Sequence, residues 1–130
     1  MKNLEIYIHI PFCVRKCEYC DFLSFPADDA AKLRYVKGLM AEMIFYGPLM
    51  KDYQVSSVYI GGGTPSSIDE QWIAALMEGV FDSFNVLPDA EISIECNPGT
   101  LSREKLLAYR DAGINRLSIG LQSANADELK

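Results

Sequence analysis

The first residues of the chain alternate between apolar and polar side chains. Single polar or aromatic positions separate Leu4, Ile6, Ile8 and Ile10, a period of two that predicts a strand with one apolar face. The period then changes to helical spacing, which predicts a helix capped by Asp28 or Asp29 and ending near residues 47–48. The apolar side of that predicted helix comprises Leu33, Val36, Leu39, Met40, Met43 and Ile44.

A second strand and helix follow with the same two periods. Residues 55–60 read as a short buried strand and residues 61–65, Gly-Gly-Gly-Thr-Pro, as a loop. Ser67 and Glu70 have the spacing of a capping box, so we expect the next helix to start there. Its predicted apolar side comprises Trp72, Ile73, Leu76, Met77, Val80 and Phe81.

Two more strands are predicted in the last third of the chain. Residues 90–96 alternate again, and a helix capped by Ser102 should end at Gly113. Residues 116–122 form the fourth predicted strand, and a further helix is expected after Ser123.

Strands that alternate with helices imply parallel crossovers and therefore an α/β fold. Two architectures fit this order: an open doubly wound sheet or part of a (β/α) barrel. A complete eight-stranded barrel needs about 250 residues. We therefore expect residues 1–130 to be the amino-terminal portion of one larger domain.

The polar faces of these strands indicate where a ligand would bind. If the apolar faces meet the helices, Tyr7, His9, Glu95 and Gln122 lie together on the other face of the sheet. Half-exposed strand faces would give the same alternation. The carboxyl ends of parallel strands are, however, the edge where both architectures bind ligands.

Charge and composition narrow the classes of partner. The chain has 12 Lys and Arg against 18 Asp and Glu, a net charge of -6, and its basic residues are scattered. We expect small-molecule partners and no nucleic acid. The amino terminus lacks the apolar run of about 20 residues that a membrane span needs, and it lacks a small-residue cleavage site. These features predict a cytoplasmic protein.

Three of the four cysteines, Cys13, Cys17 and Cys20, follow C-x3-C-x2-C spacing. Three thiolates on one short segment can hold three irons of a 4Fe-4S cluster and leave the fourth iron open to an outside ligand. Structural zinc is the competing interpretation, although zinc sites usually pair cysteines as C-x2-C and need a fourth ligand. Cys96 lies on the apolar side of its predicted strand, which favours a core position.

The glycine-rich loop and Glu95 are further candidates for ligand contact. Glycines at residues 61–63 would let a ligand approach the backbone, and bare N–H and C=O groups there could offer hydrogen bonds. The loop matches neither a phosphate-binding P-loop nor G-x-G-x-x-G. Glu95 could accept hydrogen bonds from a ribose or amine, or it could be a solvated carboxylate at a strand end. Tyr19, between two cysteines, could stack a flat ring or shield the cluster from water.

Four motifs taken together resemble the radical S-adenosylmethionine (SAM) enzymes of the coproporphyrinogen dehydrogenase type. They are Tyr7-Ile8-His9-Ile10-Pro11-Phe12-Cys13 with the triple-cysteine spacing, the Gly-Gly-Gly-Thr-Pro-Ser run at 61–66, Glu95-Cys96-Asn97-Pro98-Gly99, and the stretch 113–123. The resemblance extends from Tyr7 to the end of the chain. It implies a partial (β/α)6 barrel.

Within that group the chain is most similar to the HemW-like haem chaperones. The dehydrogenase type carries another cysteine two residues after the third, where this chain has Phe22. This branch implies haem binding and transfer to haem proteins. The alternatives are oxygen-independent coproporphyrinogen III dehydrogenase, an oxidoreductase that converts its substrate to protoporphyrinogen IX, and a zinc-stabilised α/β binding module.

The resemblance also implies roles for particular residues. It assigns Cys13, Cys17 and Cys20 to one 4Fe-4S cluster whose open iron binds SAM, which the cluster cleaves reductively. It assigns the SAM pocket to Tyr7, Tyr19, Gly62, Gly63, Thr64, Glu95 and Gln122. Haem or porphyrin, and haem-accepting proteins, are the further partners that it implies.

Overall fold

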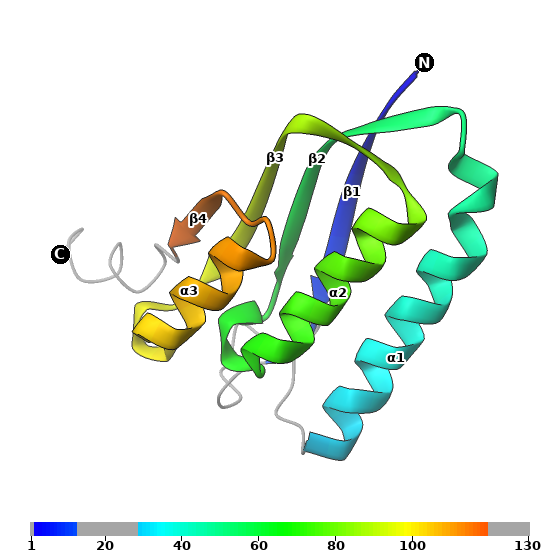
Figure 1. Ribbon diagram of the computed structural model, residues 1–130. Coiled ribbons are helices and arrows are strands. Elements are labelled where there is room, and N and C mark those ends of the chain that lie inside the picture. Colours follow the sequence, from blue (N-terminus) through cyan, green and yellow to red (C-terminus); the bar gives the residue numbers. More distant parts are fainter. Residues whose placement is uncertain (1, 13–28, 120–130) are drawn as a thin grey trace, which may run out of the picture.

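The computed structural model describes residues 2–12 and 29–119, which form one parallel sheet and three α-helices (Figure 1). The strands are β1 (Lys2–Ile10), β2 (Tyr53–Gly62), β3 (Asn85–Cys96) and β4 (Arg116–Ile119). The helices are α1 (Asp29–Tyr46), α2 (Glu70–Ser83) and α3 (Arg103–Asp111). Short 3-10 helices cover Pro48–Met50, Pro65–Ser67 and Pro98–Thr100.

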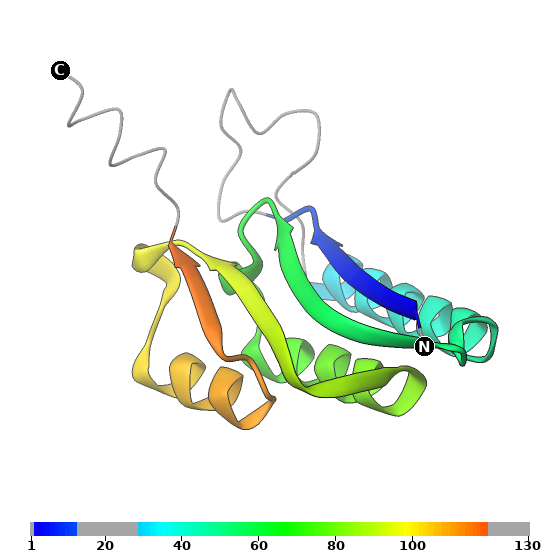
Figure 2. The same ribbon diagram turned by 90° about the horizontal axis from the view of Figure 1, so that it is seen from above.

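The order of the strands decides between the two predicted architectures. Each strand pairs in parallel with the next one along the chain, in the order β1-β2-β3-β4. Figure 2 shows a curved sheet with α1, α2 and α3 all on one side of it. A doubly wound sheet reverses its strand order and has helices on both faces. The described part of the chain is therefore α/β with the sequential arrangement of a barrel.

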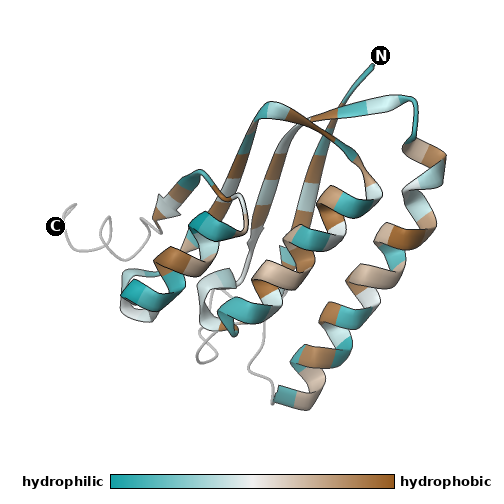
Figure 3. Cartoon of the chain, in the orientation of Figure 1, coloured by the Kyte–Doolittle hydropathy of each residue, from teal (hydrophilic) through white to brown (hydrophobic). Residues whose placement is uncertain are grey.

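The core lies between the sheet and the helices. Figure 3 shows bands of apolar and polar residues alternating along the strands, as the period of two predicts. The apolar set of β1, β2 and β3 packs against the inner sides of the helices. The fully buried residues of this core include Ile10, Val58, Ile60 and Ile94 on the strands and Ile73, Leu76, Met77 and Val80 on α2.

Three residues that the helical spacing assigns to the core lie outside it. Ile44 is 73% exposed, Phe81 is 45% exposed and Leu33 is 38% exposed. On α1 the buried stripe runs through Val36 and Met43, and Ile44 is one residue further, about 100° around the helix. Phe81 lies next to Val80 in the same way, and its ring reaches towards Gly113 beyond the end of α3.

The helix caps were predicted partly correctly. Ser102 caps α3, because its hydroxyl accepts a hydrogen bond from the Lys105 amide at 3.1 Å. Gly113 follows that helix with a φ of 98°. The capping box of α2 was wrong: Ser67 ends a 3-10 helix, and the side chain of Asp69 accepts from the Gln71 amide at 2.8 Å instead.

The third strand begins five residues earlier than predicted. Asn85 and Val86 pair with Gln54 and Val55, and the register then shifts before Ser57 pairs with Glu91. Pro88 lies inside this shift, where its missing N–H costs no ladder hydrogen bond. Alternation fails across such a bulge, which explains why the pattern revealed only the segment after it.

No helix within residues 2–12 and 29–119 is long and apolar enough to span a membrane.

Candidate cofactor site at the carboxyl edge of the sheet

Three side chains from three neighbouring strands meet near the carboxyl edge, on the face of the sheet opposite the three described helices. Tyr7 of β1 lies opposite Tyr59 of β2 in the strand register. Their rings are stacked, with centroids 6.1 Å apart and planes 12° from parallel. The Tyr59 hydroxyl donates to Glu95 Oε2 of β3 at 3.0 Å. The sheet thus connects two aromatic rings to one carboxylate.

The Glu95 carboxylate is held at both oxygens. Its Oε1 accepts a hydrogen bond from the Gly62 amide at 2.9 Å, while Oε2 accepts from Tyr59. The Tyr59 hydroxyl also lies 3.5 Å from Ser118 Oγ, a longer and weaker contact. A carboxylate has about four acceptor positions. With two of these used internally and the residue half-buried, Glu95 keeps acceptor capacity for a ligand.

Gly61 provides the space in which these side chains converge. A Cβ atom at this position would lie 2.8 Å from Glu95 Oε1, 2.9 Å from Tyr59 Cε1 and 3.1 Å from Tyr7 Cε1. Any larger residue would therefore push apart the three side chains that cover it. Gly61 is a packing requirement of the site, whereas the family resemblance drew attention to Gly62 and Gly63.

Hydrogen bonds from the Gly62–Thr64 segment hold the end of β2 against the end of β1. Gly62 has a φ of 122°, a conformation that favours glycine, and a Cβ there would lie 2.5 Å from the Ile10 carbonyl oxygen. The Gly63 amide donates to that oxygen at 2.8 Å, and the Thr64 amide donates to the Phe12 carbonyl at 2.6 Å.

The expectation that bare amides in this loop serve a ligand is therefore wrong. The N–H groups of Gly62, Gly63 and Thr64 all donate within the protein. Their bonds instead fix Ile10 and Phe12, the residues that immediately precede the cysteine segment in the sequence. A ligand at this loop would meet Cα atoms, carbonyl oxygens or the Thr64 side chain.

Tyr7 is the most open member of the site. Its side chain is 58% exposed, and its hydroxyl lies 3.2 Å from Nδ1 of His9. Partial burial raises the pKa of Tyr7, with smaller contributions in the same direction from Glu95 and Tyr59. The His9 carbonyl accepts a hydrogen bond from Tyr35 of α1 at 2.5 Å. β1 is thus fixed from the helix side while Tyr7 presents its ring outwards.

A second network holds together the loops that follow β2 and β3. Ser66 is fully buried, and its Oγ accepts a hydrogen bond from the Asn97 amide at 3.0 Å. The same hydroxyl is hydrogen-bonded to Thr100 Oγ1, and Lys105 Nζ donates to the Ser66 carbonyl. Thr100 also donates to the Asn97 carbonyl at 2.8 Å. These contacts fix the start of the loop after β3, two residues beyond Glu95.

Cys96 is a core residue, as its side of the strand predicts. It is 3% exposed, and its thiol donates to the Ile94 carbonyl at 3.6 Å. Burial raises the pKa of the Cys96 thiol to about 11; Lys105 opposes this shift and Glu95 adds to it. A protonated, buried thiol on the helix side of the sheet is poorly suited to bind a metal.

The remaining predicted site residues lie outside the described ranges. These are the three proposed cluster ligands, Cys13, Cys17 and Cys20, together with Tyr19 and Gln122. Within residues 2–12 and 29–119, no three His, Cys, Asp or Glu side chains are grouped so that they could hold a metal ion. The structure therefore brings together Tyr7, Glu95 and the glycine-rich segment.

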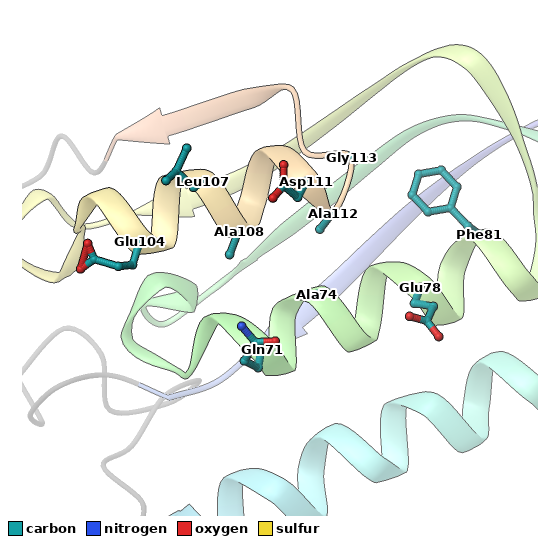
Figure 4. A pocket seen from close by; sticks show the side chains of 10 residues that line it. All are labelled: Gln71, Ala74, Glu78, Phe81, Glu104, Leu107, Ala108, Asp111, Ala112 and Gly113. Atoms are coloured by element: carbon teal, nitrogen blue, oxygen red, sulfur yellow. The ribbon is translucent and has the colours of Figure 1, made fainter.

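A groove of about 730 Å³ lies elsewhere, between α2 and α3 (Figure 4). Phe81 and Leu107 contribute apolar surface to it, and Glu78, Glu104 and Asp111 contribute carboxylates. It belongs to the helix layer, on the other side of the sheet from Tyr7 and Glu95.

A parallel sheet in sequential order, with helices on one face and a polar cluster near the carboxyl edge of the other, defines a barrel-type protein with a candidate ligand site at that edge. The family model of the Radical SAM superfamily matches residues 7–130. The chain belongs to this superfamily, whose name implies a 4Fe-4S cluster and SAM as cofactors.

Sequence similarity to individual proteins supports the same family assignment. The chain is 40% identical over 133 residues to the heme chaperone HemW of Escherichia coli, covering 98% of this chain and 34% of that protein. It is 38% identical over 131 residues to the mitochondrial radical S-adenosyl methionine domain-containing protein 1 of Bos taurus, covering 99% and 29%. The chain spans about a third of the length of such curated relatives.

A solved structure gives the same result for the fold. Coproporphyrinogen III oxidase (HemN) from Escherichia coli, described as a radical SAM enzyme, matches with a TM-score of 0.83 and 34% identity. The match covers 93% of this chain and 28% of that one. The fold is therefore the radical SAM fold, and the described part is a portion of its barrel.

The sequence does not point to Tyr59, and it marks Gly61 only as a place where a ligand could approach the backbone. The apolar run at residues 55–60 predicts a buried strand and gives no reason to expect Tyr59 on the polar face. The alternation of Val58, Tyr59 and Ile60 carries that signal, because Val58 and Ile60 are buried and Tyr59 is only partly so. No local signal identifies the packing role of Gly61, since Tyr7 and Glu95 come from two other strands.

Proposed function

We propose that this protein is a HemW-like member of the superfamily that binds a 4Fe-4S cluster and SAM, binds haem, and delivers haem to haem proteins. Support for the branch comes from the identity with proteins named heme chaperone HemW, and from Phe22 at the position where the dehydrogenase type has a cysteine. The observation that carries the cofactor part of the proposal is the doubly anchored Glu95 carboxylate beside the exposed ring of Tyr7.

The described residues suit SAM in charge and in surface character. SAM carries a positive sulfonium, an amino group and ribose hydroxyls, all of which a carboxylate attracts or accepts hydrogen bonds from. In our proposal Glu95 accepts from SAM, and Tyr7 supplies an aromatic face. Gly62, Gly63 and Thr64 form the adjoining wall, where the absence of side chains at the two glycines allows close approach. Tyr19 and Gln122 would complete the pocket.

Cys13, Cys17 and Cys20 would hold the cluster. When bound, the cluster and SAM would supply one-electron reductive cleavage of a carbon–sulfur bond. The contribution of the chain is to hold the ends of β1 and β2 together through the Gly63 and Thr64 amides, so that the cysteine segment follows a fixed Phe12. We also propose that residues 1–130 form the amino-terminal portion of one radical SAM domain, and that the protein is cytoplasmic, where thiols stay reduced.

A cysteine exchange in the full-length protein tests the cluster assignment. After anaerobic reconstitution with iron and sulfide, we expect about four irons and broad visible absorption in the wild type, and loss of the cluster in Cys17→Ser. Cys96→Ser is the matched control and should retain the cluster, because Cys96 is buried on the helix side. Tight zinc without sulfide in the wild type would instead establish the zinc-stabilised module.

Oxygen-independent coproporphyrinogen III dehydrogenase is the second candidate, supported by the structural likeness to HemN. Two assays on the reconstituted full-length protein separate the candidates. A haem titration followed by absorbance should show stoichiometric binding, with transfer to an apo-haemoprotein acceptor. Incubation with SAM, reductant and coproporphyrinogen III should leave the porphyrinogen unchanged, and formation of protoporphyrinogen IX would refute the chaperone assignment.

A further inference from the structure

Tyr59 contacts both Glu95 and Tyr7, although it belongs to none of the sequence motifs. Its hydroxyl donates to Glu95 Oε2 at 3.0 Å, and its ring is stacked on Tyr7. We propose that Tyr59 is a positioning residue for SAM: it holds the Glu95 carboxylate and supports the Tyr7 ring in their ligand-receiving orientations. This inference rests on the proposed binding of SAM to Glu95 and names a residue that determines how well that site is prepared.

Two anchors are needed because a glutamate side chain has three rotatable bonds. The Gly62 amide fixes Oε1, but a single hydrogen bond leaves the carboxylate plane free to turn about that contact. The Tyr59 hydroxyl fixes Oε2 from a different strand and so removes this freedom. Ordering a long side chain during binding reduces affinity, whereas a side chain that is already ordered avoids that cost.

The ring of Tyr59 has a separate role from its hydroxyl. It lies beside Gly61, where a Cβ would come within 2.9 Å of it, and it backs the Tyr7 ring from the neighbouring strand. Tyr7 is the exposed partner of the two, so Tyr59 acts through Tyr7 and Glu95. Because these two roles use different atoms, substitutions can separate them.

The hydroxyl of Tyr59 is not required for sheet pairing. β2 pairs with β1 and β3 through backbone hydrogen bonds, and its core contacts come from Val58 and Ile60 on the opposite face. Tyr59→Phe keeps the ring and removes only the hydroxyl, with its bond to Glu95 and its longer contact to Ser118. We therefore expect little change in cluster content or thermal midpoint, and a weaker affinity for SAM.

Equilibrium dialysis with labelled SAM on the reconstituted full-length protein tests this. Tyr59→Phe should weaken SAM binding about 3- to 10-fold, the range expected when binding must order one long side chain that was ordered before. Tyr53→Phe, at the other end of β2, is the matched control and should bind like the wild type. In a Glu95→Ala background, Tyr59→Phe should cause less than a twofold further loss.

Replacing Tyr59 with aromatic analogues gives a second test that needs no variant at Glu95. A 4-aminophenylalanine at position 59 restores a donor and should recover most of the affinity, whereas 4-methylphenylalanine should bind no better than phenylalanine. Unchanged binding by Tyr59→Phe, or equal binding by the two analogues, would overturn the positioning role while leaving SAM binding intact. A wild-type protein that retains its cluster but binds no SAM would refute the proposed function itself, and this inference with it.

Discussion

Adjacent residues at the end of β3 show how differently the two faces of the sheet are built. Cys96 points into the helix layer, where it is 3% exposed among aliphatic side chains and its thiol is kept protonated. Glu95 points to the face opposite the described helices, where both of its oxygens are hydrogen-bonded and part of it meets solvent. Buried apolar packing supports the fold on one face, and a hydrogen-bonded polar cluster prepares a binding site on the other.

The largest effect should come from Gly62, where the site joins the sheet. Gly62→Ala places a Cβ 2.5 Å from the Ile10 carbonyl oxygen and demands a φ of 122°, and neither the backbone nor an alanine can relax easily. We expect a loss of about 3 kcal/mol or more in unfolding free energy, measured by urea denaturation of the full-length protein. Such a fall in unfolding free energy would show that the backbone at Gly62, which holds Glu95 on the polar face, also supports the stability of the whole sheet.

Gly38→Ala is the matched control for that substitution. Gly38 lies inside α1, and a Cβ there meets no atom within 4 Å in the described part of the chain. Alanine should stabilise the helix by roughly 0.5–1 kcal/mol. If Gly62→Ala were as stable as the wild type, the close contact between the ends of β1 and β2 would not exist in solution.

Much of the fold followed from periodicity because the helix-covered face obeys it. Ile8 and Ile10 alternate along β1 and are buried, and Val36 and Met43 recur at helical spacing on α1. The pattern failed where geometry was not periodic, at the register shift that contains Pro88. Helical spacing also does not show where the buried side of a helix ends, and it therefore places Ile44 in the core although Ile44 is exposed.

The site was less predictable, because its contacts join strands far apart in sequence. Glu95 and Tyr7 could be assigned to one face by alternation and by family resemblance. That Glu95 accepts bonds from Gly62 and Tyr59, and that Gly61 leaves room for both rings, depends on the register between three strands. Alternation within one strand carries no information about that register.

The next effect concerns Cys96 and the pH dependence of stability. The ordinary thiol pKa is 9.0, and the folded state raises that of Cys96 to about 11 by burial. Its contribution to stability is therefore fully present below pH 9 and is lost as pH rises towards 11, because the unfolded chain releases the proton first. Compared with Cys96→Ala, the wild type should lose about 2 kcal/mol more between pH 8 and pH 11.

Anaerobic urea denaturation at several pH values measures this difference. Lysines and tyrosines titrate in the same range, but they are common to both proteins, so the difference between the two curves isolates Cys96. Glu95→Gln should leave most of this pH slope unchanged, since burial is the largest cause of the shift. Parallel curves for wild type and Cys96→Ala would mean that the thiol meets water, and that the two faces differ less than their packing indicates.

The smallest effect should come from removing a hydroxyl on the helix-covered face. Tyr109 of α3 is 1% exposed, and its hydroxyl has no hydrogen-bond partner within the described ranges. Burial raises the pKa of Tyr109, with smaller contributions from Cys96 and Glu70. Tyr109→Phe should therefore leave the unfolding free energy unchanged or raise it by up to about 1 kcal/mol.

Tyr35→Phe is the comparison variant: it removes a hydrogen bond to the His9 carbonyl and should lower the unfolding free energy by about 1 kcal/mol. Together with Tyr59→Phe, which should alter SAM affinity instead of stability, these substitutions test whether a hydroxyl serves the fold, serves the site, or is only tolerated. A loss at Tyr109 as large as at Tyr35 would reveal a hydrogen-bond partner for its hydroxyl and would weaken the contrast between the two faces.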